Sequence, residues 1–144
     1  MATVNIYLHF NGNCEEAFNF YKEVFGGDFS MISRFKDMPP GDKMPPLPPE
    51  YADKIMHVAL PISNETVLMG SDVAGEWSQK FVPGTNFSIS VNDADLQEAQ
   101  RIFNRLSEGG EVLMPFEKAF WGSHFGMLND KFGINWMVSC EEQK

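Results

Sequence analysis

The side chains best suited to proton transfer or metal binding are three histidines, His9, His57 and His124. No pair of them has a spacing typical of metal ligands, such as HxH or HxxxH. A histidine can act as a general base because its ordinary pKa is close to neutral. His9 and His57 fall on expected strands that could face one cavity, although a structural or surface role is more common for such residues. His124 lies beside Trp121 in the glycine-framed segment WGSHFG, where a functional role is as well supported as a structural one.

An aromatic segment, FWGSHFGMLNDKFGINWM, covers residues 120–137 and could form one wall of a ligand pocket. Aromatic rings stack on flat or apolar ligands, and methionine side chains adapt to their shape. Trp121 is the first choice for a cavity position, whereas Phe132 and Trp136 are expected in the core and Asp130 in a turn. The predicted pocket residues are Trp121, His124, Phe125, Met69 and Met137.

The two cysteines, Cys14 and Cys140, are far apart in the sequence and form no CxxC motif. Neither a disulfide framework nor a zinc-thiolate site is therefore indicated. Cys140 is expected to be a small buried hydrophobic residue, because the sequence places no base beside it.

Hydrophobic periodicity in the first half of the chain predicts a strand, a helix and three further strands. The first strand covers residues 4–10 and stops at NGN, after which Asn13 and Glu16 form a capping-box pattern. The apolar face of the helix consists of Cys14, Ala17, Phe18, Tyr21 and Phe25, and GGD ends the helix. The later strands are expected at residues 29–35, 54–62 and 65–72.

Residues 36–53 are rich in proline, which lacks the backbone donor that a sheet interior needs. This segment is expected to be a surface excursion, either a lid or an arm that reaches a partner subunit. Residues 73–85 have the composition of a linker.

The same order of elements then begins again, which predicts two modules at residues 1–72 and 86–140 of a single domain, 1–144. A strand at 86–91 precedes a helix for which Asn92 and Asp93 are candidate N-caps. The apolar face of that helix consists of Leu96, Ala99, Phe103 and Leu106. Three strands are expected at residues 111–116, 120–128 and 134–140.

The opening FNGNCEEAFNFYKEVFGG resembles the vicinal oxygen chelate superfamily, also called the glyoxalase/bleomycin resistance/dioxygenase fold. The C-terminal FWGSHFGMLNDKFGINWMVS resembles its PhnB-like branch, often labelled demethylubiquinone methyltransferase-like. The resemblance covers residues 4–140. It implies an α+β fold of tandem βαβββ modules, whose curved mixed sheets surround a concavity that is usually completed in a homodimer.

The resemblance also implies a divalent metal held by side chains from the first and last strands of each module. Matched to this sequence, the ligand positions fall near Ile6, Met69, Asn86 and Met137. Hard divalent cations prefer carboxylate or imidazole ligands, which these positions lack. No cofactor is therefore predicted and no metal ligand is assigned, although a divalent metal bound through other residues is possible.

The label of methyltransferase is not expected to describe an activity. A Rossmann-type enzyme needs a glycine-rich turn after its first strand, whereas NGNCEE contains one glycine. The βαβββ order also differs from that of a doubly wound parallel sheet.

The net charge of −9 argues against binding to nucleic acids or to anionic membranes. No apolar run approaches the ~20 residues of a membrane helix, and the N-terminus lacks the pattern of a signal peptide. A cytoplasmic location is the simplest expectation.

The preferred hypothesis is a small-molecule-binding protein without the usual metal-lyase chemistry. The alternative is a metal- or His-dependent enzyme of lyase, isomerase or dioxygenase type, acting on a small oxygenated substrate. In that enzyme His9, His57 or His124 would be the general base or a metal ligand. A third hypothesis is an interaction protein whose proline-rich segment, residues 37–50, docks a partner.

Overall fold

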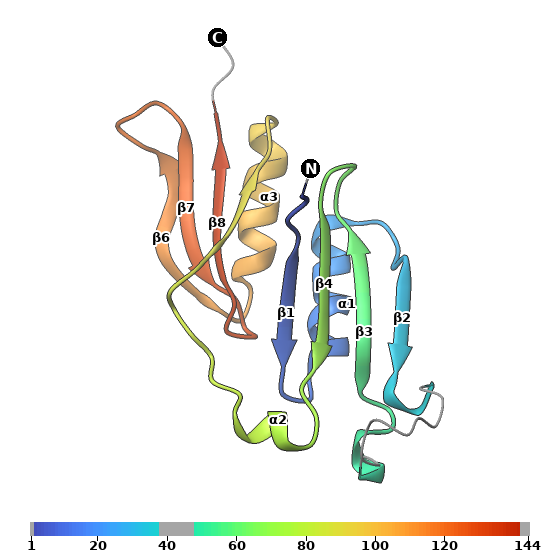
Figure 1. The fold of residues 1–144 in the computed structure, drawn as a ribbon. Coiled ribbons are helices and arrows are strands. Elements are labelled where there is room, and N and C mark those ends of the chain that lie inside the picture. Colours follow the sequence, from blue (N-terminus) through green and yellow to red (C-terminus); the bar gives the residue numbers. More distant parts are fainter. Residues whose placement is uncertain (1, 38–47, 142–144) are drawn as a thin grey trace. The chain divides into compact units, whose positions relative to one another are not determined.

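The computed structural model describes residues 2–37 and 48–141, and the chain divides into two compact units, Met1–Val82 and Pro83–Lys144. Each unit contains one four-stranded sheet and one long helix, as Figure 1 shows. The boundary between the units falls in the segment that the sequence identifies as a linker. No helix within the described ranges is both long and apolar enough to cross a membrane.

The sheet of the first unit is mixed, with strand order β1-β4-β3-β2. Strands β1 and β4 run parallel, and the β3–β4 and β2–β3 pairs are antiparallel. The elements are β1 (Ile6–Phe10), α1 (Cys14–Phe25), β2 (Met31–Arg34), β3 (Ile55–Pro61) and β4 (Val67–Asp72). Two short 3-10 helices (Phe35–Asp37 and Pro49–Tyr51) and α2 (Glu76–Gln79) complete the unit.

The second unit repeats this topology, with strand order β5-β8-β7-β6. Again the first and last strands are parallel and the other pairs antiparallel. Its elements are β5 (Ile89–Asn92), α3 (Leu96–Ser107), β6 (Glu111–Lys118), β7 (His124–Asn129) and β8 (Asn135–Cys140). The predicted α+β fold of tandem βαβββ modules is therefore confirmed.

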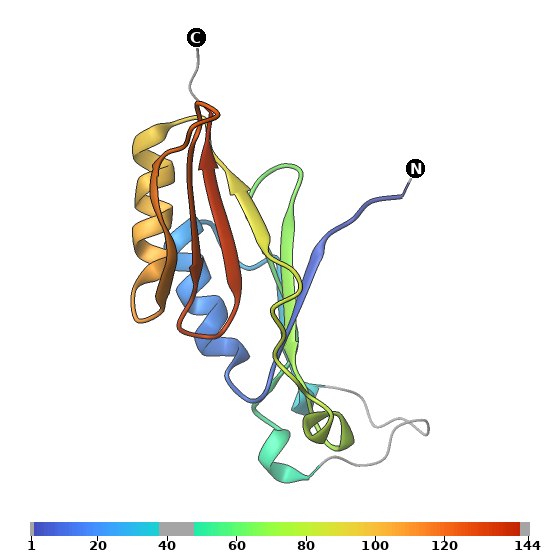
Figure 2. The same ribbon diagram turned by 90° about the vertical axis from the view of Figure 1, so that its left-hand side faces the viewer.

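Each long helix covers one face of the sheet in its own unit, and Figure 2 shows α3 lying along its sheet. Most residues predicted for the helix faces are buried. The two exceptions are Phe25 and Leu96. Phe25 is only half-buried, and the preceding residue, Val24, is buried in its place. Leu96 lies in the first turn of α3 and is 43% exposed. Helix ends bury less surface than the middle turns, which periodicity alone does not indicate.

The start of α1 differs from the prediction, because Asn13 makes no side-chain cap. The carboxylate of Asp72, at the end of β4, accepts hydrogen bonds from the backbone N–H groups of Gly12, Cys14 and Ile55. A residue that is distant in sequence therefore binds the first turn of the helix, and local spacing could not show this.

The cap of α3 also differs from the prediction, since it is neither Asn92 nor Asp93. The side chain of Asp95 accepts from Gln97 N–H, as an N-cap should. Asp93 instead accepts from the backbone N–H of Asp95. The helix therefore begins later than the first polar residues after the strand suggest.

Two other expectations need correction, and a third lies mostly outside the described residues. The strand expected at 120–128 begins only at His124, because residues 119–123 form a turn. In this turn the backbone N–H of Ala119 donates to the oxygen of Ser123, and the backbone N–H of Gly122 donates to the oxygen of Ala119. The expected linker contains the short helix α2. Most of the proline-rich segment, residues 38–47, lies outside the described residues, so its predicted role as a lid, arm or docking segment stays a prediction.

The face of each sheet that its own helix does not cover is called here the helix-free face. Gly70 and Gly126 mark the opposite, helix-facing side, since an added Cβ would lie 2.6 Å from the ring of Phe18 in α1 or of Phe103 in α3. Side chains alternate along a strand, so the neighbours of these glycines point to the helix-free face.

Candidate functional site

A polar row of side chains crosses the helix-free face of the first unit. His9 of β1 pairs with Ser71 of β4, and His57 of β3 pairs with Ser33 of β2. Because Val58 pairs with Gly70, the adjacent residues His57 and Ser71 also lie opposite one another. The polar row is therefore His9, Ser71, His57 and Ser33.

An apolar row lies next to it on the same face. Tyr7 pairs with Met69, Met69 pairs with Ala59, and Ala59 pairs with Met31. These four residues define the apolar row. Tyr7 is 39% exposed and Met31 is also exposed, so the ends of the row are in contact with solvent.

Tyr7 joins the two rows through its contacts with both histidines. Its hydroxyl oxygen lies 3.3 Å from Nδ1 of His57, within hydrogen-bonding distance. Its ring centroid lies 5.1 Å from that of His9 and 5.7 Å from that of His57. From the sequence, His9 and His57 lie on strands that could face one cavity; the register places both on the helix-free face, each in contact with Tyr7.

The polar row also contains an unsatisfied hydroxyl group. The Oγ atom of Ser33 is buried and has no hydrogen-bond partner within the described parts of the chain. A buried hydroxyl without a partner is unfavourable by about 1–3 kcal/mol, so such groups commonly bind water or a ligand.

The charged groups nearest this end of the sheet are engaged in ion pairs. Arg34, which follows Ser33, donates to Glu15 at 3.1 Å and to the backbone oxygen of Asp53. The hydrogen bond and charge of Arg34 lower the pKa of Glu15, and the same contact raises the pKa of Arg34. Lys36 pairs with the side chain of Asp53 at 2.9 Å.

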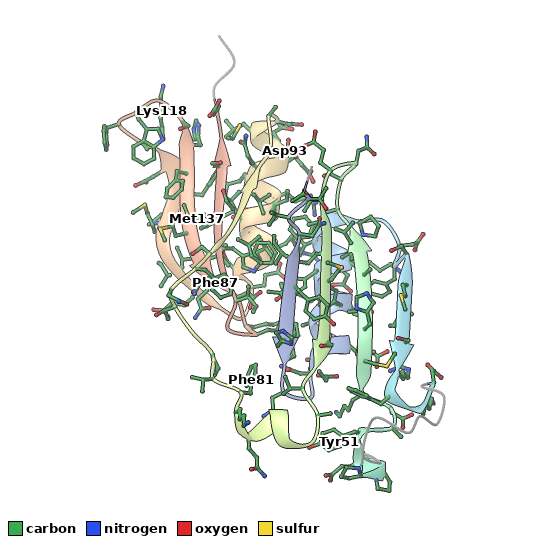
Figure 3. The ribbon with its side chains drawn as sticks, in the orientation of Figure 1. Tyr51, Phe81, Phe87, Asp93, Lys118 and Met137 are labelled. Carbon is green, nitrogen blue, oxygen red and sulfur yellow. The ribbon has the colours of Figure 1, made fainter. Side chains whose placement is uncertain are left out.

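The helix-free face of the second unit has a different chemistry. Met137 of β8 pairs with Met127 of β7, which pairs with Met114 of β6, so three thioethers lie in one row. Figure 3 labels Met137 on β8. Phe125 lies on this face beside Met127, and its ring centroid is 5.7 Å from that of Trp121. Polar groups on this face include Ser139 and Asn92, whose side-chain oxygens are 3.4 Å apart.

His124 lies on the other side of this sheet. It is two residues before Gly126, so it shares the helix-facing side, and its ring centroid lies 5.9 Å from that of Phe116. Its Nδ1 atom is buried without a hydrogen-bond partner among the described residues. The strand alternation therefore separates His124 from Phe125, which the sequence analysis assigns to one pocket.

The five predicted pocket residues are divided between the two units and, in the second unit, between the two sides of its sheet. Met69 lies on the helix-free face of the first unit, while Met137 and Phe125 lie on that of the second. Trp121 is in the turn before β7 and is 55% exposed. The sequence analysis expected Trp121 on a strand, and the glycine after it, with φ of 99°, instead favours the turn.

The remaining candidates have structural surroundings. Trp136 is buried, as predicted, and its indole N–H donates to Asp130 at 2.8 Å. Asp130 also accepts from the backbone N–H groups of Phe132 and Ile134, which confirms its turn position. Phe132 is only half-buried in that turn, so its predicted core position is wrong. Cys140 is buried, as expected.

The positions matched to superfamily metal ligands carry side chains that hard divalent ions do not prefer. Ile6 pairs with Leu68 on the helix-facing side of the first sheet, away from Met69. Met69 and Met137 offer thioethers, which suit soft metals rather than hard ones. Within residues 2–37 and 48–141, no three His, Cys, Asp or Glu side chains are placed to hold a metal ion.

Sequence reasoning missed Tyr7, Ser71 and Ser33 as partners of the two histidines. The strand period offers a signal for Tyr7, because residues two apart in a strand share a face. Ser71 and Ser33 could not be found this way, since their placement depends on the register between strands.

Comparison with known proteins gives a consistent result over the whole chain. A family model described as 3-demethylubiquinone-9 3-methyltransferase matches residues 2–139. Protein YjdN from Escherichia coli strain K12 is 27% identical over 143 residues, which is 96% of this chain and 95% of YjdN.

Solved structures support the same relationship. Protein PA1353 from Pseudomonas aeruginosa is 39% identical with a TM-score of 0.82, covering 99% of this chain and 100% of that one. The PhnB protein from Bacillus cereus is 28% identical with a TM-score of 0.69, covering 94% and 97%. A glyoxalase/bleomycin resistance protein/dioxygenase family enzyme from Burkholderia phytofirmans shares the fold at 10% identity, with a TM-score of 0.57 and coverage of 93% and 95%.

Proposed function

The chain belongs to the 3-demethylubiquinone-9 3-methyltransferase family, and within that family we propose that it is a small-molecule-binding protein. The proposed binding surface is the helix-free face of the first unit, formed by the polar row and the apolar row. The observation that carries this proposal is the convergence of Tyr7, His9 and His57 from two different strands.

Three features of this face suit a small ligand. Its hydrogen-bonding groups lie in one row and its apolar groups in the next, so one molecule can contact both. The apolar row includes Met69 and Met31, whose side chains adapt to ligand shape. The buried hydroxyl of Ser33 offers a hydrogen bond that the described chain does not use.

A ligand-observed NMR screen of a small-fragment library tests this proposal. We expect a subset of fragments to bind the wild-type protein and to lose at least tenfold in affinity with His57→Phe, since a lost hydrogen bond to a charged group has about this effect. The matched control is His124→Gln, which removes a histidine from the helix-facing side of the sheet in the second unit. Fragments that bind both variants as they bind the wild type would contradict the proposal.

A second candidate function is a His-dependent enzyme, favoured by the contact between Tyr7 and His57. In the tautomer whose Nδ1–H donates to the Tyr7 hydroxyl oxygen, Nε2 has no proton and is the nitrogen through which His57 would accept one from a substrate. The test is to incubate each bound fragment with the protein and to follow its NMR spectrum over time. A chemical change of the fragment that is lost in His57→Gln while binding persists would favour the enzyme. Fragments that bind but stay chemically unchanged would favour a binding function without catalysis.

A homodimer also stays a proposal, taken from the family resemblance. Light scattering coupled to size-exclusion chromatography measures the mass directly. A mass near that of the 16.3 kDa chain would contradict it.

A further inference from the structure

The polar row consists of hydrogen-bond donors that carry no negative charge. His9, Ser71, His57 and Ser33 each carry an N–H or O–H group. The hydrogen bond between the Tyr7 hydroxyl and Nδ1 of His57 uses one donor of that pair and leaves the other for a ligand. A group with several acceptor lone pairs, such as a carboxylate, could accept from more than one of these donors. The strongest indication is the contact of Tyr7 with both His9 and His57.

The charges on this face favour an anion over a cation. Neither row contains Asp, Glu, Lys or Arg. The nearby cations Arg34 and Lys36 are already paired with Glu15 and Asp53. A bound cation would find no carboxylate within the two rows, whereas an anion would meet donors and no repelling charge.

The apolar row indicates what the rest of the ligand looks like. The apolar row crosses all four strands and runs parallel to the polar row, two residues away along each strand. Neighbouring strands are about 4.8 Å apart, so a flat body the size of an aromatic ring covers two of them. Tyr7 provides an aromatic surface at one end of this strip.

From these observations we propose that the ligand of this face is an organic anion, with an oxyanion group over the polar row and a flat apolar body over the apolar row. This inference rests on the proposed function and specifies the class of ligand. The imidazoles of His9 and His57, which both contact Tyr7, are the groups that would hold the oxyanion.

Four small probes that share parts of this chemistry test the ligand class on the wild-type protein. Benzoate has both the oxyanion and the flat body, benzyl alcohol and benzylamine replace the head with a neutral or cationic group, and acetate lacks the body. Affinities are measured by titration monitored through NMR of the histidine ring protons. We expect benzoate to bind at least tenfold more tightly than the other three. Benzyl alcohol and benzylamine lack the ionised acceptor, whose hydrogen bonds are about twice as strong as neutral ones, and acetate lacks the apolar body that the apolar row would cover.

Two single variants locate the effect, and both replace exposed or half-buried side chains. His9→Phe and His57→Phe should each weaken benzoate by about tenfold while leaving benzyl alcohol nearly unchanged. His9→Asn and His57→Asn repeat the test with smaller side chains, and thermal unfolding confirms that each variant is folded. His124→Gln should bind benzoate as the wild type does.

The outcomes separate the ligand class from the proposed function. If benzyl alcohol or benzylamine binds as tightly as benzoate on this face, the anion proposal is wrong and the binding function stands. If neither these probes nor any library fragment disturbs His9 or His57, both proposals are wrong.

Discussion

Asp72 is a buried carboxylate that holds three parts of the first unit together. It is 4% exposed and accepts hydrogen bonds from Gly12, Cys14 and Ile55. Asp72→Ala leaves three backbone N–H groups without this acceptor, so we expect the free energy of unfolding to fall by about 3 kcal/mol or more. Urea unfolding monitored by circular dichroism measures the change.

Asp28→Ala is the matched control for that prediction. Its side chain is 91% exposed and pairs with Lys22 on the surface, so the loss should be below about 0.5 kcal/mol. Equal effects of the two substitutions would show that Asp72 does not organise the unit.

Cys14 provides a prediction about reactivity. Burial raises the pKa of its thiol well above the ordinary range, and the negative charges of Asp72 and Glu15 raise it further. The nucleophilic thiolate is therefore scarce at pH 8, and iodoacetamide should modify Cys14 only after the protein is unfolded. Mass spectrometry of labelled peptides checks this. Rapid labelling of Cys14 in the folded protein would contradict the burial.

At the scale of single residues, the sequence identifies His9 and His57 but not what surrounds them. Their shared face and the proximity of Ser71 and Ser33 depend on register across three strand pairs. Strand periodicity alone relates only Tyr7 and His9, which lie in one strand. The capping role of Asp72 is hidden for the same reason, since its partners lie far away in sequence.

At the scale of elements, Gly70 and Gly126 allow each long helix to approach its sheet closely. A Cβ at Gly70 would lie 2.6 Å from the ring of Phe18 in α1 and 2.9 Å from the backbone oxygen of Leu8 in β1. One at Gly126 would lie 2.6 Å from the ring of Phe103 in α3 and 2.8 Å from Cα of Phe116 in β6. Backbone atoms cannot move aside cheaply, so Gly70→Ala and Gly126→Ala should each lower the free energy of unfolding by about 1–3 kcal/mol. Urea unfolding measures both.

Gly84→Ala is the control, because its nearest contact is the Asn86 side-chain oxygen at 3.4 Å. We expect its stability to stay within about 0.5 kcal/mol of the wild type. Wild-type stability of Gly70→Ala and Gly126→Ala would mean that the helices do not pack as described.

Element order was predictable because strand and helix periods are clear in both modules. The boundaries were not, and the segment before β7 shows why. FWGSH has aromatic residues typical of a strand, but Gly122 adopts a positive φ and the backbone closes a turn. Phe120, 98% exposed, and Trp121 therefore lie outside the sheet that their residue types suggest.

For the whole molecule, the topology bears on the activity named in the family's description. Enzymes that bind S-adenosylmethionine through a Rossmann fold use a doubly wound parallel sheet, whereas both units here have mixed sheets. We expect isothermal titration calorimetry to detect no tight binding of S-adenosylmethionine. A micromolar dissociation constant would contradict this prediction.

The central claim, that the first unit binds a small molecule on its helix-free face, can be tested with methyl-labelled methionine. Met69 reports on the proposed face, and Met137 on the helix-free face of the second unit. Two-dimensional NMR should show the Met69 methyl signal shifting with the fragments that bind, together with the ring signals of His9 and His57. Binding that shifts Met137 and leaves Met69 and both histidines unchanged would contradict the claim.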